Sequence, residues 1–542
     1  MNSKKILCIR ILITILVMAI LYYFFIPPIN ISSPDFWFFV VIIIGLYFIT
    51  GILKLFDSHQ IIKSYTKMMN GDYSKLSLKN YYPYLILPAI ILGIITVNLI
   101  CSPLFQAKSY AKRIEVKEDT EFTKDVKQVD FNSLPLLDKD SSEKLGDRVM
   151  GQMPEFVSQY YVSNLYTQIN YNDDIVRVTP LEYINFIKYI TNYKNGVKAY
   201  ITVNSVTGDS KLVKLEKGMK YMPSAYFGHD LRRKLRFTYP TEIFDQESFE
   251  LDDKGNPYWI VPTVKYTGVG MKKEITGVVI LDPITGKSKK YKVKDVPEWV
   301  DHVYSAPLLI EQLDDWGTYQ RGFINSIFGQ KGVVITTEGY NYTTMNNDVY
   351  LYTGVTSIAK DASNIGFVMT NMRTKETHFY RVPGAEEYSA MASARGQVQQ
   401  MKYEATFPLL INLNNRPTYL MSLKDNAGLI KMYAFVDVMD YQKVVVTDAS
   451  KGIEAAAQNY LGDVELESSD EKETISITIK EIIPTMINGT SYYYMIDNDD
   501  NRYRVSIKID EELIPFLKEE DEIEIEYKQK GTLKEITKIK QK

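Results

Sequence analysis

Cysteine and histidine are the residue types that this sequence has least of. The 542 residues include two cysteines, Cys8 and Cys101, and four histidines. Both cysteines lie in apolar stretches near the N-terminus, so the rest of the chain cannot be stabilised by disulfides. Four histidines are few for acid–base catalysis or for metal binding. We therefore expect no metal site, no cofactor and no catalytic residues.

A strong excess of charge of either sign is also lacking. The chain has 63 basic and 66 acidic residues, a net charge of −3, which argues against a protein whose main partner is a polyanion. The sequence contains no G-x-S-x-G, H-E-x-x-H or Walker-type phosphate-binding motif. These absences together favour a protein that is not an enzyme.

Two pairs of neighbouring His and Asp residues keep a hydrolase as an alternative. His229 is followed by Asp230, and Asp301 is followed by His302. A working site would bring one of these histidines, or His378, within hydrogen-bonding distance of a carboxylate in an open cleft. We interpret the pairs instead as surface residues of helices.

Long apolar runs are what the first 107 residues do have. The runs cover 6–26, in which Arg10 is the one charged residue, then 36–53 and 81–107. A helix of about 20 apolar residues crosses the hydrocarbon layer of a bilayer, so we expect three transmembrane helices that anchor the chain through residues 1–107. A cleavable signal peptide is the alternative for the first run, but no small-x-small cleavage site follows it.

The lysines between the apolar runs predict the orientation. The connection 27–35 contains no Lys or Arg, while the connection 54–80 contains five lysines. Because positively charged loops stay in the cytoplasm, we expect a multi-pass protein of the cytoplasmic membrane, with residues 108–542 outside the cytoplasm.

The middle of the chain is expected to be α+β. We interpret 108–140 as a linker, because it is rich in charge and poor in pattern, and 141–193 as helical, with Thr179-Pro180 as a helix start. Strands with period-two alternation and turn signals follow. Because the order of strands and helices repeats, we expect two tandem α+β modules with antiparallel sheets, 141–330 and 331–462.

Two turns in this region resemble those of a known family. Asn204-Ser-Val-Thr-Gly208 and Asp282-Pro-Ile-Thr-Gly286 each follow a strand rich in Val and Ile. A helix packed on an antiparallel sheet with such a turn is similar to the PepSY-like modules of bacterial envelope proteins, over about 179–460. The resemblance implies a non-catalytic interaction module, which in some relatives regulates peptidases.

The C-terminal region 463–542 predicts a small barrel. Strands are expected at 475–482, 492–497, 503–509, 522–527 and 533–538, with a helical stretch at 510–517 between the third and the fourth. Five strands with a helix after the third are the order of an OB-fold-like barrel.

Four tyrosines of the barrel are candidates for binding a partner: Tyr492, Tyr493, Tyr494 and Tyr503. Aromatic side chains of OB-folds stack on the bases of single-stranded nucleic acid. However, 463–542 contains 20 acidic and 12 basic residues, and this charge would repel phosphates. The alternative is that the tyrosines pack the barrel core.

The sequence as a whole predicts a bacterial, membrane-anchored α+β multidomain protein without enzymatic activity. Its expected role is interaction or scaffolding in the cell envelope. The expected partners are the lipid bilayer and another envelope protein or peptide, which an exposed strand edge could capture by strand addition. The alternative is a membrane-associated nucleic-acid-binding protein that uses the barrel.

Overall fold

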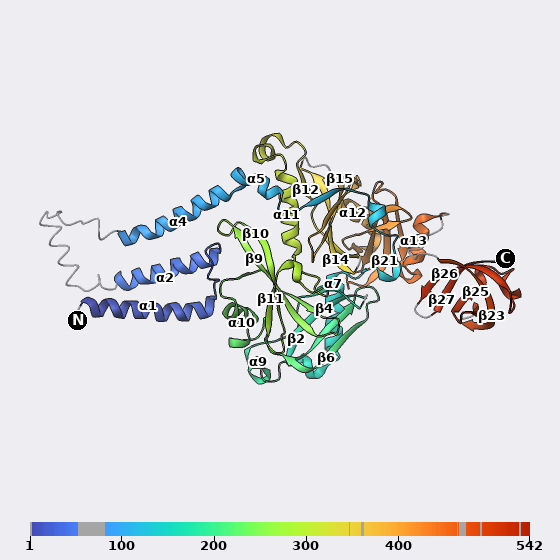
Figure 1. Cartoon of the computed structure of the whole chain (residues 1–542), viewed down its shortest axis with the longest axis horizontal. Helices are drawn as coiled ribbons and strands as arrows, with labels where there is room; N and C mark the ends of the chain where they lie inside the picture. The colour runs from blue at the N-terminus through green and yellow to red at the C-terminus, as the bar shows by residue number, and fades with distance from the viewer. Residues whose placement is uncertain are drawn as a thin grey trace. The chain divides into compact units, whose positions relative to one another are not determined.

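The computed structural model describes residues 3–52, 82–172, 174–345, 347–358, 363–462, 464, 473–487, 490–530 and 533–541. The chain forms two compact units (Figure 1). Met1–Val126, Phe131–Asn412 and Arg416–Val464 make up the first unit, and Lys127–Asp130, Leu413–Asn415 and Glu465–Lys542 make up the second.

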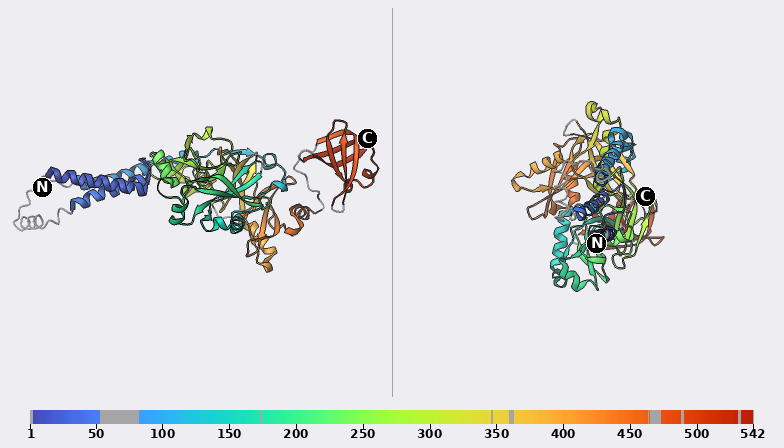
Figure 2. Two further views of the ribbon diagram at one scale, coloured as in Figure 1. Left: turned by 90° about the horizontal axis from the view of Figure 1, so that it is seen from below. Right: turned by 90° about the vertical axis from the view of Figure 1, so that its left-hand side faces the viewer.

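Three apolar helices open the first unit: α1 (Ser3–Phe25), α2 (Pro34–Ile52) and α4 (Tyr82–Cys101), of which α1 and α2 lie side by side and α4 stands apart from them in Figure 1, while Figure 2 shows them from two other sides. Within the described ranges, no single helix is both long and apolar enough to cross a membrane. The prediction of three transmembrane helices in residues 1–107 is therefore wrong.

The lengths of the apolar helices found among the described residues account for this result. The apolar parts of the first two helices, Ile11–Phe25 and Pro34–Tyr47, are shorter than the roughly 20 residues that a span needs. The third apolar run is divided by a bend of 49° between Leu85–Cys101 and Pro103–Ala111, and by length and composition this bent pair together could cross. The lysine-rich connection 54–80 lies outside the described residues.

The predicted linker 108–140 is folded instead. It contains the end of α5 (Pro103–Ala111), β1 (Val116–Thr120), α6 (Phe122–Asp125) and η2 (Phe131–Ser133). β1 pairs in parallel with β16 (Thr377–Tyr380), and Phe122 and Phe131 are buried. These apolar residues stand singly among charges, so the sequence shows no periodic pattern.

The described body of the first unit consists of four sheets that repeat one strand order. In each sheet two short strands pair with the first strand of a three-stranded antiparallel meander. The first sheet contains β2 (Tyr160–Val162), β3 (Thr167–Tyr171), β4 (Asp174–Tyr183), β5 (Val197–Asn204) and β6 (Ser210–Met219). The second contains β7 (Ile243–Phe244), β8 (Ser248–Leu251), β9 (Pro257–Thr267), β10 (Lys272–Leu281) and β11 (Ser288–Tyr291).

The third and fourth sheets have the same order. The third contains β12 (Val334–Thr336), β13 (Asn341–Met345), β14 (Asp348–Ser357), β15 (Ser363–Asn371) and β16, with β1 and β17 (Gly384–Ala385) added. The fourth contains β18 (Glu404–Ala405), β19 (Leu409–Leu413), β20 (Arg416–Lys424), β21 (Ile430–Asp437) and β22 (Val444–Asp448). Each predicted module thus contains two sheets, and a single sheet is the repeating unit.

Helices separate the sheets along the chain. The longer ones are α7 (Lys139–Gly151), α10 (Leu231–Thr238), α11 (Ala306–Tyr319), α12 (Glu387–Gln397) and α13 (Ile453–Leu461). The shorter ones are α8 (Pro154–Val157), α9 (Phe186–Asn192), η3 (Phe227–His229), η4 (Val293–Asp295), η5 (Asn325–Gly329), η6 (Gln399–Met401) and η7 (Ala449–Lys451). One apolar core joins the first two sheets, and a second core joins the second sheet to the third.

The turn between the last two meander strands begins in the same way in all four sheets. Its first residue is Asn204, Asp282, Asn371 or Asp437, and the side-chain Oδ1 accepts hydrogen bonds from the backbone N–H groups two and three residues further on. Asn and Asp favour such turns because their side chains replace a backbone acceptor.

The predicted helical region 141–193 is wrong in its second half. β2, β3 and β4 lie there, and Thr179-Pro180 is inside β4 rather than at a helix start. Nine of the ten residues of β4 are buried, so the strand shows no alternation. Pro180 lies where β4 passes from partner β2 to partner β3, and this gap in the ladder tolerates a residue without an N–H.

The second unit contains a closed five-stranded barrel, as predicted. Its strands are β23 (Glu473–Ile487), β24 (Thr490–Asp497), β25 (Arg502–Ser506), β26 (Glu522–Lys530) and β27 (Leu533–Gln541), in the order β23-β24-β25-β27-β26. The short helices η8 (Ile507–Ile509) and η9 (Ile514–Phe516) lie between the third strand and the fourth. The likeness to OB-folds stays a prediction.

Candidate functional site

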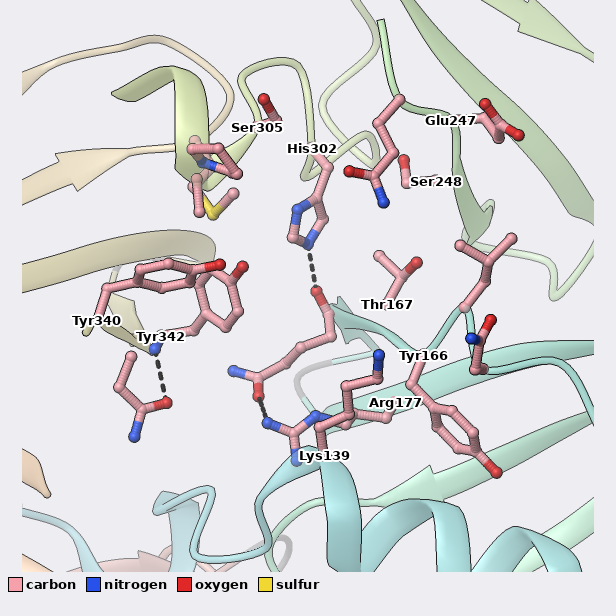
Figure 3. Close-up of a pocket in the computed structure, with 18 of the residues that line it drawn as sticks. Lys139, Tyr166, Thr167, Arg177, Glu247, Ser248, His302, Ser305, Tyr340 and Tyr342 are labelled. Atoms are coloured by element: carbon pink, nitrogen blue, oxygen red, sulfur yellow. Dashed lines mark hydrogen bonds between the residues drawn. The ribbon is translucent and has the colours of Figure 1, made fainter. Parts of the chain in front are cut away.

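A cavity of 530 Å³ lies where the four sheets of the first unit meet (Figure 3). The equivalent short strands β3, β8 and β13 border it, together with Phe407, which precedes the equivalent strand β19. This volume is within the range of small-molecule and peptide side-chain pockets. The polar and charged lining residues are Asp138, Lys139, Asn164, Tyr166, Thr167, Gln168, Arg177, Gln246, Glu247, Ser248, His302, Ser305, Tyr340, Asn341 and Tyr342.

Arg177 is the buried cation of this cavity. It lies on β4 directly opposite Gln168 of β3, and 6% of its surface is exposed. Its guanidinium donates to the side-chain oxygen of Gln168 at 2.8 Å, to the hydroxyl of Ser142 at 3.3 Å and to the carbonyl of Leu137. No carboxylate of the described residues forms an ion pair with it. Burial lowers the pKa of Arg177 to about 10, against the attraction of Asp138.

The two carboxylates that line the cavity are bound to other groups. Asp138 caps α7 by accepting from the backbone N–H of Ser141, and it forms an ion pair with Lys424. Glu247 lies 3.2 Å from the guanidinium of Arg232. The positive charge of Arg177 is therefore not neutralised by the acidic residues of its own cavity.

Gln168 holds an unused donor at the same place. It is 2% exposed, and its side-chain Nε2 has no hydrogen-bond partner within the described structure. The hydroxyl of Tyr166, also a lining residue, lacks a partner in the described structure too, but it points away from the cavity toward Gly146 of α7 (Figure 3). A buried donor without an acceptor costs about 1–3 kcal/mol, so Gln168 favours a ligand that brings an acceptor oxygen.

A pair of buried acids supports the wall that carries His302. Glu250 is fully buried, and its carboxylate accepts from the backbone N–H of Asp301 at 2.8 Å and from that of His302 at 3.2 Å. Asp301 in turn accepts from the backbone N–H of Asn170 at 2.8 Å. Burial, and then the nearby Glu250 carboxylate, raise the pKa of Asp301 well above its ordinary value.

The histidines that sequence analysis considered for a hydrolase are spread over the fold. His302 lines the cavity, but its Nε2 lies 2.6 Å from the backbone carbonyl oxygen of Gln168. His229 contacts the hydroxyl of Tyr189 at 3.2 Å. His378 lies 3.3 Å from Glu376 but is not among the residues that line the cavity. Among the described residues, no three His, Cys, Asp or Glu side chains come together in a way that could hold a metal ion.

The four candidate tyrosines of the barrel do not form one surface. Tyr503 is fully buried and donates to Asp497 at 2.9 Å, so it is not exposed to a partner, and its assignment as a binding residue is wrong. Tyr493 packs against the barrel core. Tyr492 and Tyr494 flank Arg504, whose guanidinium lies 5.1 Å from the ring centre of Tyr492. Because successive residues of a strand point to opposite faces, Tyr493 lies on the other face of β24 from Tyr492 and Tyr494.

The cavity residues Arg177 and Gln168 were missed in the sequence. The sequence feature that could have identified Arg177 is its position among the apolar residues of Ile175-Val-Arg-Val178. An arginine that interrupts a buried strand is rare unless it is paired or functional. That signal was hidden because the region was read as a helix.

Comparisons with known proteins assign no family. No family model and no curated protein matches the sequence. Among solved structures, a GH32 β-fructofuranosidase of Bombyx mori, as a mutant in complex with sucrose, aligns with 9% identity and a TM-score of 0.19 over 74% of this chain and 70% of that chain. A second structure of the same enzyme gives 10% identity and a TM-score of 0.18 over the same shares. Similarity this low carries no argument about fold or function.

Proposed function

We propose that this protein is a non-enzymatic, membrane-associated binding protein of the bacterial cell envelope. In this proposal the four-sheet cavity holds a carboxylate of a peptide or of another envelope protein. The observation that carries the proposal is Arg177, a buried guanidinium without an acidic partner among the described residues. Burying an unpaired charge is costly, and an anionic ligand would offset that cost.

Another cavity group suits the same ligand. The unpaired Nε2 of Gln168 adds a donor beside the guanidinium of Arg177. A guanidinium binds a carboxylate through two parallel hydrogen bonds. The resemblance to PepSY-like modules, which implies an interaction module, agrees with a peptide as the partner.

Binding of short peptides tests this proposal. We expect the full chain to bind fluorescent tripeptides with a free C-terminal carboxylate, and amidation of that carboxylate to weaken binding about tenfold or more. Arg177→Gln should weaken binding, whereas Tyr166→Phe, which removes a hydroxyl that faces Gly146 of α7, should not. Arg381→Gln is the matched control, because Arg381 is an exposed arginine that pairs with Glu118, and neither residue lines the cavity.

Equal binding of free and amidated peptides, or full binding by the Arg177→Gln variant with an unchanged unfolding temperature, would overturn the proposed site. The placement of residues 108–542 outside the cytoplasm is part of the same proposal. A tag fused after Lys542 should be readable by antibody on intact cells from which the outer wall has been removed.

The barrel gives the second candidate function a specific basis. Tyr492 and Tyr494 of β24 flank Arg504 of β25, and the second and third strands are the face by which OB-folds bind oligonucleotides. The excess of acidic residues in 463–542 opposes binding. Titration of the wild type and of Tyr492→Ala with a single-stranded oligonucleotide tests this second function. Binding that is weaker in Tyr492→Ala would support it, and no binding by the wild type would exclude it.

A further inference from the structure

One surface of the first unit exposes a group of apolar side chains. We call it the aromatic face, and it comprises Ile184, Phe186, Ile187, Ile190, Tyr226, Phe227 and Phe237, all exposed. They belong to α9, η3 and α10 or lie next to them. Ile187 is 69% exposed and Phe227 is 51% exposed. Exposed apolar patches on otherwise polar proteins mark interaction surfaces.

The aromatic face is continuous. The ring of Phe186 lies 5.0 Å from that of Tyr226 and 6.0 Å from that of Phe227. The hydroxyl of Tyr189 donates to the carbonyl of Tyr226 at 2.9 Å, which fixes α9 against η3. Phe227 has a φ of 55°, a left-handed conformation that a bulky side chain rarely adopts, and in it the ring remains exposed.

This face continues directly onto the end of α1. Phe237 contacts the rings of Tyr22 and Tyr23 at 6.1 and 6.2 Å. Arg233 donates to the carbonyl of Tyr23 at 3.2 Å, and Arg236 donates to that of Ile26 at 2.9 Å. Figure 1 shows α10 beside the end of α1. The helix itself exposes apolar side chains along its length, among them Leu12, Leu16, Phe24 and Phe25.

Basic residues are interspersed with the aromatic ones. Residues 184–194 contain two lysines, Lys188 and Lys194, and no acidic residue. Residues 226–238 contain one acidic residue, Asp230, which caps α10 by accepting from the backbone N–H of Arg233 at 2.7 Å. The same segment carries three basic residues that reach the surface, Arg232, Arg233 and Lys234, whereas Arg236 is buried.

We propose that the aromatic face lies on a lipid bilayer. Aromatic residues concentrate at membrane–water interfaces, and lysines and arginines beside them are attracted by anionic headgroups. Because the aromatic face continues onto the exposed apolar side chains of α1, the two together form a larger apolar surface for lipid contact. The proposal rests on the membrane association in the proposed function, and it adds that the sheet-bearing part of the unit also contacts lipid.

A fluorescent label tests the contact. In a variant without cysteines (Cys8→Ser, Cys101→Ser), single cysteines are introduced by Ile187→Cys or Met439→Cys and labelled with an environment-sensitive nitrobenzoxadiazole dye. Met439, 68% exposed, is the matched control, because it follows β21, which lies away from α1 within the same unit (Figures 1 and 2). Both full-length proteins are reconstituted into phosphatidylcholine vesicles containing about one-third phosphatidylglycerol.

The label at Ile187 should become about twofold brighter or more with vesicles and shift to shorter wavelength, while the label at Met439 stays as in water. Phe186→Ser together with Phe227→Ser should reduce the response at Ile187. If the protein co-floats with the vesicles in a density gradient but the two labels respond alike, the aromatic face does not contact lipid, while the proposed membrane association is supported. If the chain does not float, membrane association fails and this inference fails with it.

Discussion

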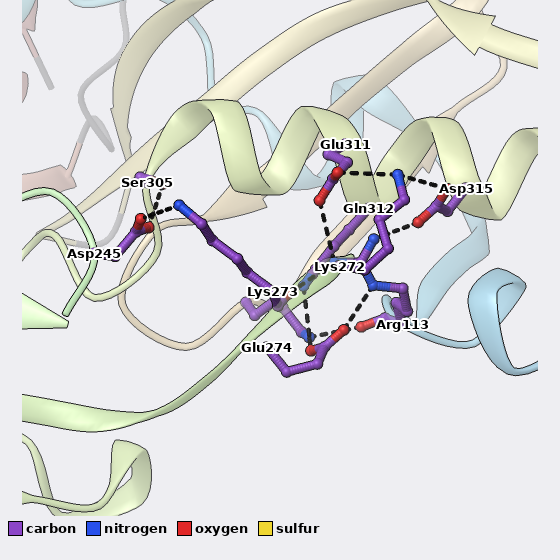
Figure 4. A network of polar contacts seen from close by, with 10 residues as sticks. Arg113, Asp245, Lys272, Lys273, Glu274, Ser305, Glu311, Gln312 and Asp315 are labelled. Atoms are coloured by element: carbon purple, nitrogen blue, oxygen red, sulfur yellow. Dashed lines mark hydrogen bonds and ion pairs between the residues drawn. The ribbon is translucent and has the colours of Figure 1, made fainter. Parts of the chain in front are cut away.

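Arg113 and Asp315 form a buried ion pair that joins the end of α5 to α11 (Figure 4). Both side chains are 6% exposed. Arg113 also lies 2.7 Å from Glu274 of β10, and Lys272 lies 3.3 Å from Asp315. This network fastens the segment that follows the N-terminal helices to the second sheet and to α11.

Removal of the cation should therefore destabilise the first unit. Arg113→Ala leaves the carboxylates of Asp315 and Glu274 with one cation fewer in a buried site, and breaking a buried pair in this way costs about 3–5 kcal/mol. Urea unfolding followed by tryptophan fluorescence measures the loss, since Trp316, 9% exposed, is next to Asp315.

The control for this prediction is Lys117→Ala. Lys117 also forms an ion pair, with Glu376, but both side chains are largely exposed, and exposed pairs contribute little. The unfolding midpoint of this variant should be close to that of the wild type. Equal losses in the two variants would show that the Arg113 network does not stabilise the unit.

Two glycines at equivalent turn positions offer a second comparison. Gly208 and Gly286 end the repeated turn with φ values of 80° and 70°. A Cβ atom at Gly286 would lie 2.3 Å from the ring of Tyr221, whereas one at Gly208 would come no closer than 3.5 Å to Leu137. Both alanine variants place a side chain in the left-handed region, which costs about 1–2 kcal/mol.

Gly286→Ala should therefore lose more stability than Gly208→Ala, by about 1–3 kcal/mol from overpacking against the tyrosine ring. Thermal unfolding of the two variants beside the wild type measures the difference. An equal loss of stability in Gly286→Ala and Gly208→Ala would mean that the ring of Tyr221 moves aside at no cost in free energy. The double variant Gly286→Ala with Tyr221→Ala should recover part of the loss if the ring is the cause.

Local chemistry explains what the sequence predicted well. The turns at Asn204 and Asp282 were recognisable because an Asn or Asp side chain acts on backbone groups only two and three residues away. The fourth barrel strand was recognisable because Ile523, Ile525 and Tyr527 are buried and alternate with glutamates. Both signals lie within a few residues of the chain.

Long-range packing explains what the sequence did not predict. β4 is covered on both faces, so buried and exposed residues do not alternate along it. Arg177 of this strand lines a cavity that residues of β3, β8 and β13 complete, and the sequence does not show which strands come together. The apolar runs of 1–107 were counted as continuous, but the bend at Ser102 divides the third. Tyr503 and Tyr492 are the same residue type, and strand register alone places one of them inside the barrel.

A third prediction concerns these two tyrosines. Tyr503→Phe removes the hydroxyl that donates to Asp497 at 2.9 Å, and the barrel should lose about 1 kcal/mol. Tyr492→Phe, on the half-exposed surface beside Arg504, should leave stability almost unchanged. Urea unfolding monitored by hydrogen exchange of residues 473–541 separates the barrel from the first unit. A larger loss from Tyr492→Phe would contradict the assignment of Tyr503 to the core.

The buried carboxyl of Asp301 should make stability depend on pH. Burial, and then Glu250, raise the pKa of Asp301 well above its ordinary value of about 4. The folded protein therefore retains a proton that the unfolded chain releases as the pH rises above about 4. Since stability falls with pH wherever the folded state binds more protons, this group destabilises the fold by up to about 1.4 kcal/mol per pH unit until its folded pKa is reached.

Asp301→Asn should remove that slope. The asparagine side-chain oxygen can still accept from the backbone N–H of Asn170, as the carboxylate does at 2.8 Å, but it cannot ionise beside Glu250, Asp348 and Arg373, the charged groups that act on Asp301. Unfolding temperatures at intervals from pH 5 to pH 8 should decline less in this variant than in the wild type or in Asp253→Asn, which changes an exposed turn. Parallel declines in all three proteins would mean that Asp301 is ionised in the folded state and would contradict this prediction.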